Sequence, residues 1–278
     1  TNVLGVEWDT VEDRLFTNKE KIASDFMNKP GTKRNILHAT AQFYDPLGLF
    51  SPVGIVAKMI FQDHGSLEES IASGFDMELA FLGQQTSFVI YMHPLMDRDR
   101  RNDMTADVHV FCDASERAYE AVEYERSTYK NITLVRIVCS KNRLAPVKKV
   151  TLPRLELLAA LIGTRLLRYF RQEISFNINK ATLWSDSTVA LGWIRNDPNR
   201  WKTLVSNRVK KKNSKHATLR QLRHFPGDQN PADYLTRGVD ADQLSSYTCG
   251  DMDLTGLHKT TLSELHNNYT FVTAKGQK

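Results

Sequence analysis

Hydrophobic and polar positions alternate with a period of two where the first strands of a sheet are expected. Val108, Val110 and Cys112 alternate with His109, Phe111 and Asp113 in "VHVFCD". This period predicts a β-strand. A second strand is expected around 121–126 and a third in "NITLVRIVCSKNRL", 131–144. Three strands so close together in sequence predict an antiparallel meander.

The pattern then changes to helical spacing in "VTLPRLELLAALIGTRLLRYFRQEI". Thr151 can cap this helix, and Pro153 is tolerated in a first turn. The apolar stripe that defines it consists of Leu155, Leu158, Ala159, Ile162, Leu166, Tyr169 and Phe170. Such a stripe predicts a long helix with one buried face.

Four further elements follow the long helix. "ATLWSDS" predicts a buried strand, 188–195 a helix, "RWKTLVSNRVKKK" a second helix and "ATLRQLRHF" another strand. A short last helix is expected after Asn230, with Pro231 in its first position and Gly238 as its stop. The order βββαβααβα predicts an α/β fold with a mixed five-stranded sheet flanked by helices.

The rest of the chain has a different character. In residues 1–104, "LGVEWDTVEDRLF" predicts two strands joined by a turn, and "TKRNILHATAQFYDPLGLFSPVGIVAKMIFQDH" predicts two helices around the loop "DPLGLFSP". Residues 92–107 are polar and read as a linker, and residues 241–278 are polar and weakly periodic. We therefore expect three parts: 1–104, 105–240 and a tail at 241–278.

Positive charge is concentrated in one stretch of a chain whose net charge is only +5. Between residues 195 and 223 there are ten basic residues and one acid. Those basic residues are Arg195, Arg200, Lys202, Arg208, Lys210, Lys211, Lys212, Lys215, Arg220 and Arg223. Such a block is typical of a phosphate-binding surface, although a solvated helix face has the same composition. Trp201, inside the block, could stack on a base or anchor the helix.

Cysteine usage and hydropathy exclude several classes of protein. The three cysteines are far apart and form no CxxC pair, which supports neither a zinc site nor a disulfide framework. A reduced intracellular compartment fits this usage better. No signal peptide and no apolar run long enough to span a bilayer occur, so no membrane partner is expected. Because the chain begins with Thr, we expect a fragment or a processed piece of a longer protein.

Four acidic residues lie at the ends of predicted elements. Asp113 closes the first strand of the meander, Asp186 closes the fourth strand, and Glu156 and Asp233 lie in the first turns of two helices. Each alone could be a cap or complement a helix dipole, and Asp186 between two serines resembles an N-cap. If the first and fourth strands are neighbours, however, Asp113 and Asp186 point into one cleft.

A cluster of all four carboxylates would need a cation, because like charges repel at close range. Oxygen ligands suit Mg²⁺ or Mn²⁺, and two such ions roughly 3.5–4 Å apart can drive phosphodiester hydrolysis. Together with the basic block, the quartet predicts a metal-dependent nuclease.

Six sequence blocks resemble one family. "FCDAS", "LPRLELLAALIG", "LWSDSTVALGWI" and "NPADYLTRG" are similar to the signature blocks of the ribonuclease H region of BEL/Pao-type retrotransposon polyproteins. "LGVEWD" and "FYDPLGLFSPV" resemble the end of the reverse transcriptase palm and its thumb. The resemblance covers roughly residues 4–240 and implies an RNase H-like fold that cleaves RNA in RNA–DNA hybrids.

The resemblance also implies ligands and partners. Asp113, Glu156, Asp186 and Asp233 would hold two Mg²⁺ or Mn²⁺ ions. The partners would be the RNA–DNA hybrid and the rest of the retrotransposon polyprotein, in the cytoplasm within virus-like particles or in the nucleus. Residues expected to contact nucleic acid are Ser115, Ser187, Trp201, Lys210, Lys211, Lys212, Lys215 and Arg237.

Other features depart from the family or exclude rival activities. No YxDD polymerase motif is present, and no Asp-Thr/Ser-Gly peptidase motif occurs, the nearest string being "DLTG" at 253–256. An integrase-like enzyme would carry its Glu after both Asp residues, whereas Glu156 lies between Asp113 and Asp186. Residue 120 is Glu where the family usually has Gly, which keeps open a catalytically inactive remnant or a domesticated nucleic-acid-binding module. Glu120 would impair activity if it lies beside the acids, and would be neutral if it points to solvent on an edge strand.

Overall fold

The computed structural model describes two compact units. One comprises residues 1–46, 50–97 and 238–278, and the other residues 47–49 and 98–237. The described residues are 2–3, 6–9, 14–16, 34, 38, 45, 47–48, 51–63, 88–91, 105–129, 132–174, 178–213, 222–238 and 272–273. The boundaries expected at residues 104 and 240 stay predictions.

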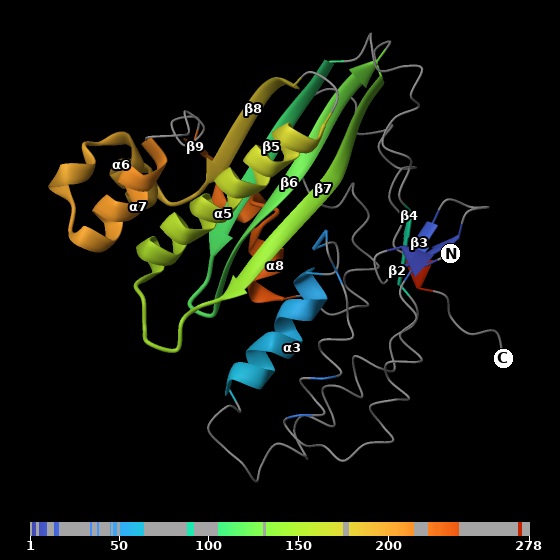
Figure 1. The fold of residues 1–278 in the computed structure, drawn as a ribbon, viewed down its shortest axis with the longest axis horizontal. Helices are drawn as coiled ribbons and strands as arrows, with labels where there is room; N and C mark the ends of the chain where they lie inside the picture. Colours follow the sequence, from blue (N-terminus) through green and yellow to red (C-terminus); the bar gives the residue numbers. More distant parts are fainter. Residues whose placement is uncertain are drawn as a thin grey trace. The chain divides into compact units, whose positions relative to one another are not determined.

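The unit around residues 98–237 is built on a five-stranded mixed sheet (Figure 1). Its strands are β5 (Thr105–Ala114), β6 (Ala118–Tyr129), β7 (Ile132–Leu144), β8 (Ile178–Ser185) and β9 (Leu222–His224). They lie in the order β7-β6-β5-β8-β9. The first three form the expected antiparallel meander, and β8 and β9 run parallel to β5. The predicted mixed sheet is therefore confirmed.

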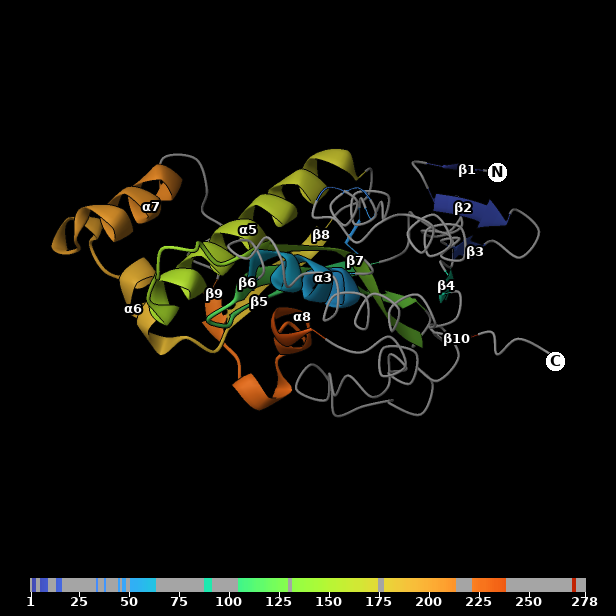
Figure 2. The same cartoon turned by 90° about the horizontal axis from the view of Figure 1, so that it is seen from below.

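Helices cover both faces of this sheet. Helix α5 (Leu152–Glu173) lies across β5 and β6 on one face, and the short α8 (Asp233–Arg237) lies on the other (Figures 1 and 2). Helices α6 (Thr188–Arg195) and α7 (Thr203–Asn213) pack beyond the β8–β9 side. The element order matches the βββαβααβα prediction, and α6 has the predicted bounds.

Helix α5 approaches the sheet closely at Gly163. A Cβ added there would lie 2.6 Å from the Cys112 sulfur, closer than real Cβ atoms pack, and 3.0 Å from a Val110 methyl carbon. The helix and the sheet enclose the main apolar core, which includes Leu157, Leu167 and Leu183. This close contact fixes the helix over β5, and with it the position of Glu156 two turns earlier.

The other unit contains the expected N-terminal hairpin. Strands β2 (Val6–Asp9) and β3 (Arg14–Phe16) pair antiparallel, with Trp8 opposite Leu15. Strands β1 (Asn2–Val3), β4 (Phe88–Tyr91) and β10 (Val272–Thr273) extend this sheet and were not predicted. Helix α3 (Ser51–Asp63) accounts for the second helix expected in residues 1–104, whereas most of the first lies outside the described residues.

Two features of the described residues concern the predicted compartment. Cys112 and Cys139 are free thiols, and Cys249 lies outside the described residues. Within the described ranges, no helix is both long and apolar enough to cross a membrane.

Candidate active site

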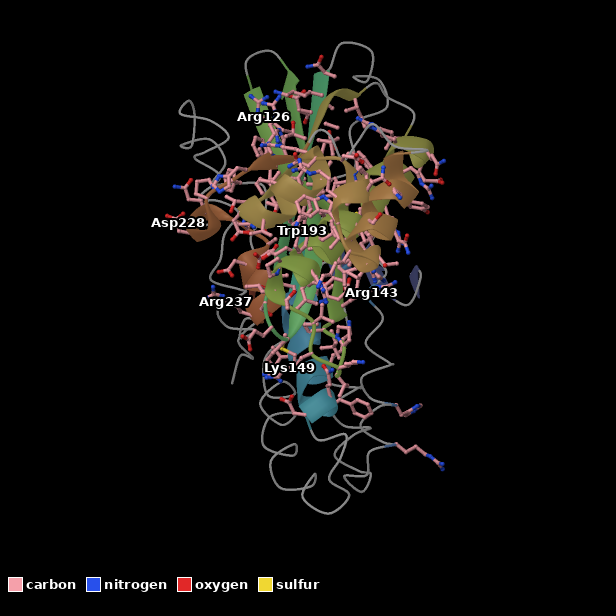
Figure 3. The ribbon with its side chains drawn as sticks, turned by 90° about the vertical axis from the view of Figure 1, so that its left-hand side faces the viewer. Arg126, Arg143, Lys149, Trp193, Asp228 and Arg237 are labelled. Carbon is pink, nitrogen blue, oxygen red and sulfur yellow. The ribbon has the colours of Figure 1, made fainter. Side chains whose placement is uncertain are left out.

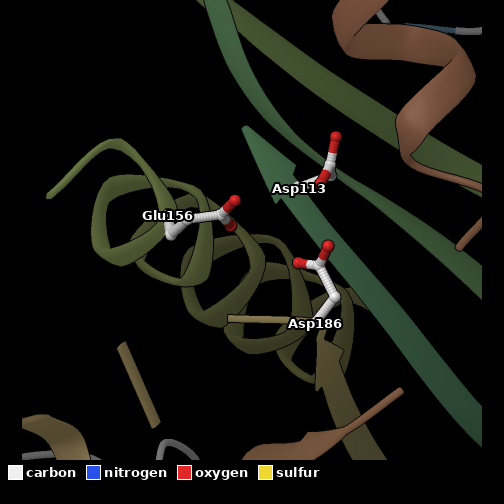
Figure 4. Close-up of side chains that lie close together, drawn as sticks. All are labelled: Asp113, Glu156 and Asp186. Atoms are coloured by element: carbon white, nitrogen blue, oxygen red, sulfur yellow. The ribbon is translucent and has the colours of Figure 1, made fainter. Parts of the chain in front are cut away.

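Three carboxylates from three elements converge at one end of the central strands. Strands β5 and β8 are parallel neighbours, with Phe111 level with Trp184, so Asp113 and Asp186 lie at the same level two residues later. Glu156 reaches them from the second turn of α5 (Figure 4). One oxygen from each of the three side chains lies within 4.8 Å of the others. The adjacency expected for Asp113 and Asp186 is therefore confirmed.

The local capping roles fall to serines rather than to these acids. Ser187 is the N-cap of α6, and its Oγ accepts a hydrogen bond from the Ala190 N–H at 3.2 Å. In the turn after β5, Ser115 Oγ accepts from the Arg117 N–H at 3.3 Å and the Ala118 N–H at 3.1 Å. Asp186 and Asp113 are therefore free to face each other, and the capping interpretation of Asp186 is wrong.

Burial and mutual repulsion hold these carboxyl groups away from their usual acidity. Burial, and then the charges of Asp186 and Asp233, raise the pKa of Asp113 to about 7 against the opposing hydrogen bond from Thr236. Burial and the neighbouring Asp113 and Asp186 raise the pKa of Glu156 to about 9. Burial likewise raises the pKa of Asp186. These shifts report an electrostatic environment that favours a bound proton or a cation.

The cluster also contains buried oxygens that could serve as ligands. Within the described residues, Glu156 Oε2 and Asp186 Oδ1 are buried without a hydrogen-bond partner. A buried carboxylate oxygen without a partner is costly, and a metal ion is one group that can satisfy it. The donor set is entirely carboxylate, which fits a hard divalent cation.

Asp233 stands outside the group of three. Its Oδ1 accepts a hydrogen bond from Arg237 Nε at 2.8 Å, in a pair spaced by one helical turn. Its charge nevertheless raises the pKa of Asp113, Glu156 and Asp186, so it lies near them. The structure thus brings together three of the four predicted acids and leaves Asp233 at the margin in an ion pair.

Four of the residues expected to bind nucleic acid, namely Ser115, Ser187, Trp201 and Arg237, make different contacts in the structure. Ser115 and Ser187 are engaged in the turn and the cap already described. Trp201 donates from Nε1 to the Trp193 carbonyl at 3.2 Å and packs against the main core, so its ring anchors α6 to α7. Arg237 is exposed and forms an ion pair with Asp233. Arg237 and Asp228 lie on the same side of the view in Figure 3.

The lysines expected to bind nucleic acid are only partly described. Lys210 is exposed on α7, where Lys211 and Lys212 follow it in the backbone. Lys215 lies outside the described residues. The roles of all these residues in binding stay predictions.

Glu120 is not a solvent-facing residue of an edge strand. It lies on β6, an interior strand, directly opposite Asp113, and its side chain is fully buried. The exposure that the neutral interpretation assumed is therefore wrong, and the effect of Glu120 on activity stays a prediction.

Two residues of the site had no recognisable signal in the sequence. A Cβ at Gly227 would lie 2.8 Å from Asp186 Oδ2, so this glycine makes room for the carboxylate. Thr236 donates from Oγ1 to Asp113 Oδ2 at 2.8 Å. Thr236 lies in the block "NPADYLTRG", and Gly227 lies shortly before that block. Neither residue type nor spacing indicates these two contacts.

Comparison with protein families gives one match over more than half of the chain. Residues 32–187 match the Pao retrotransposon-like RNaseH-like domain. This protein belongs to that family. The matched segment contains Asp113, Glu156 and Asp186, and ends before Asp233 and before the whole basic block. Together with the strand order, membership of the Pao family identifies the fold as RNase H-like.

Comparison with individual proteins adds less. Among solved structures, the chain is similar to LC11-RNase H1 in complex with an RNA/DNA hybrid, at 14% sequence identity and a TM-score of 0.32. The similarity covers 50% of this chain and 100% of that one. No curated protein matches this chain.

Proposed function

We propose that this Pao-family protein is a divalent-metal-dependent endonuclease that cleaves RNA in RNA–DNA hybrids as part of a retrotransposon polyprotein. The observation that carries the proposal is the convergence of Asp113, Glu156 and Asp186 within 4.8 Å, with unpartnered buried oxygens on two of them. An RNase H-like fold with such a cluster favours hydrolysis of a phosphodiester over any other chemistry that the described residues offer.

The three carboxylates fit Mg²⁺ or Mn²⁺. Asp113, Glu156 and Asp186 would hold the metal, with Asp233 beside them as the fourth expected ligand. When bound, two such ions would lower the pKa of an attacking water and stabilise the leaving oxygen. The protein's contribution is to hold the carboxylates in place: β5 and β8 fix two of them, and the close packing of α5 fixes the third.

The close approach of Gly227 to the Asp186 carboxylate gives a direct test of whether the position of this carboxylate matters for cleavage. Gly227→Ala puts a methyl group 2.8 Å from Asp186 Oδ2, so the carboxylate must shift. We therefore expect hybrid cleavage to fall by about 10- to 100-fold, as for displacements of about 1 Å in other sites. Gly192→Ala on α6 is the matched control, because a Cβ there meets nothing within 4 Å. Equal rates for the two variants would contradict the role assigned to Gly227.

The basic block supports hybrid binding through phosphate contacts. Replacing Lys210, Lys211 and Lys212 by Ala should flatten the dependence of log K on log salt by up to roughly three units, since each phosphate contact contributes about −0.9 on B-form DNA. Binding of a labelled hybrid would be measured by fluorescence anisotropy at several salt concentrations. An unchanged slope would assign these lysines to a solvated helix face.

Glu120 favours a second candidate, a nucleic-acid-binding remnant without catalysis. A fully buried Glu lies directly opposite Asp113 on the neighbouring strand. Should it hold the carboxylates in a metal-free arrangement, the protein would bind the hybrid and not cut it.

Cleavage and binding of the same substrate separate the two candidates. An RNA–DNA hybrid labelled on the RNA strand would be incubated with the protein in Mg²⁺, in Mn²⁺ and in excess EDTA. The nuclease cuts the RNA strand in either metal and stops in EDTA. Tight binding without cleavage in both metals would establish the remnant instead, and cleavage in EDTA would contradict the metal-dependent mechanism.

A further inference from the structure

The hydroxyl of Thr236 makes a buried contact with one of the three clustered acids. Its Oγ1 donates to Asp113 Oδ2 at 2.8 Å, and both side chains are buried, with Thr236 0% and Asp113 4% exposed. We propose that Thr236 is a positioning residue, whose hydroxyl fixes the Asp113 carboxylate so that its other oxygen is presented to a metal ion. This inference rests on the proposed metal-dependent function.

The hydroxyl has one proton and two possible acceptors. Oγ1 lies 2.8 Å from Asp113 Oδ2 and 3.1 Å from the Asp233 carbonyl oxygen. A carboxylate is the stronger acceptor, and the shorter distance agrees with a charge-assisted hydrogen bond. The proton therefore belongs to the contact with Asp113.

The backbone of Thr236 is held as well, so its hydroxyl cannot easily turn away. The Thr236 N–H donates to the Ala232 carbonyl at 3.3 Å, and its own carbonyl lies 3.2 Å from the donor Oγ of Ser115. Asn230 fastens the segment before α8 by donating from Nδ2 to the Cys112 carbonyl at 3.1 Å. Helix α8 and the segment before it are thus hydrogen-bonded to two neighbouring residues of β5, Cys112 and Asp113.

This attachment has a consequence for metal binding. A carboxylate that accepts a fixed hydrogen bond on one oxygen loses its freedom to rotate, so less entropy is lost when the other oxygen binds an ion. Partners of this kind typically change metal affinity by about 10- to 100-fold when removed. The same helix carries Asp233, so Thr236 also keeps Asp233 near the three acids.

The test compares Mn²⁺ binding by isothermal calorimetry on the full chain. Thr236→Val keeps the shape and removes the donor, and we expect its Kd for Mn²⁺ to rise roughly tenfold or more. Thr236→Ser keeps the donor and should stay within about threefold of the wild type. Thr164→Val is the matched control: Thr164 is equally buried on α5, but its Oγ1 donates to the Ala160 carbonyl and not to a clustered acid.

The outcomes are distinct. Wild-type affinity in a folded Thr236→Val, or equal weakening in the Ser variant and the Thr164→Val control, overturns the proposal. If the Val variant does not fold, Thr236→Ala serves in its place, because it lacks the donor and puts no methyl group against the carboxylate. If Asp113→Asn binds Mn²⁺ as well as the wild type, the metal site itself is wrong and the proposal falls with it. Mn²⁺ binding that depends on Thr236 in a protein that cuts no hybrid would refute only the proposed function.

Discussion

Asp186→Asn is expected to reduce cleavage of an RNA–DNA hybrid by about 1,000-fold or more, equivalent to about 4 kcal/mol in the activation free energy. Asn preserves the size of the side chain and removes the charge that a divalent ion requires. Because Ser187 caps α6, the substitution removes no capping interaction. The loss should therefore come from the site and not from unfolding.

The rates would be measured from single-turnover cleavage of a labelled hybrid in Mg²⁺, with circular dichroism to confirm the fold. Asp228→Asn is the control, because Asp228 is an exposed acid of the same segment as Gly227, outside the cluster (Figure 3). Near-normal cleavage by Asp186→Asn, or an equal loss in Asp228→Asn, would move the active site elsewhere.

Glu156→Gln is expected to stabilise the metal-free protein increasingly as the pH rises. Burial, and then the charges of Asp113 and Asp186, raise the pKa of Glu156 from about 4.5 to about 9. Between these values the folded state keeps a proton that the unfolded state has lost, so the stability of the wild type falls as the pH rises through this window. The variant lacks this dependence and gains up to about 1.4 kcal/mol per pH unit relative to the wild type.

Urea unfolding in EDTA at pH 5, 6.5 and 8 measures this difference. At pH 8, we expect Mg²⁺ to stabilise the wild type, because an ion that binds only the folded state lowers its free energy, and to stabilise the variant much less. Glu173→Gln provides the control, since Glu173 is an exposed residue at the end of the same helix. A difference between Glu156→Gln and the wild type that does not change with pH would show that Glu156 is already ionised in the folded protein.

The sequence was informative where a single period governs a whole element. β5 was predictable because its residues alternate with a period of two, and α5 and α6 because their apolar residues recur with a period of 3.6. The meeting of Asp113 with Asp186 followed from the parallel pairing of two strands that end at the same level. Of the strand predicted at 217–225, the structure describes Leu222–His224 as β9, and residues 217–221 lie outside the described residues.

What the sequence could not predict depends on contacts between distant residues. The burial of Glu120 and the hydrogen bond from Thr236 to Asp113 are set by how β6 and α8 pack, not by local pattern. The same holds for Gly227, whose role is visible only once the Asp186 carboxylate lies against it. Short strands such as β4 also cannot be predicted from the sequence, because four residues are too few to show a period.

The central claim is that Asp113, Glu156 and Asp186 together bind a divalent metal ion. Anomalous diffraction from crystals of the protein soaked in Mn²⁺ tests it most directly. The account predicts an anomalous peak within bonding distance of oxygens from all three carboxylates, and its loss in crystals of Asp186→Asn. A well-diffracting crystal with Mn²⁺ peaks only elsewhere on the protein would contradict it.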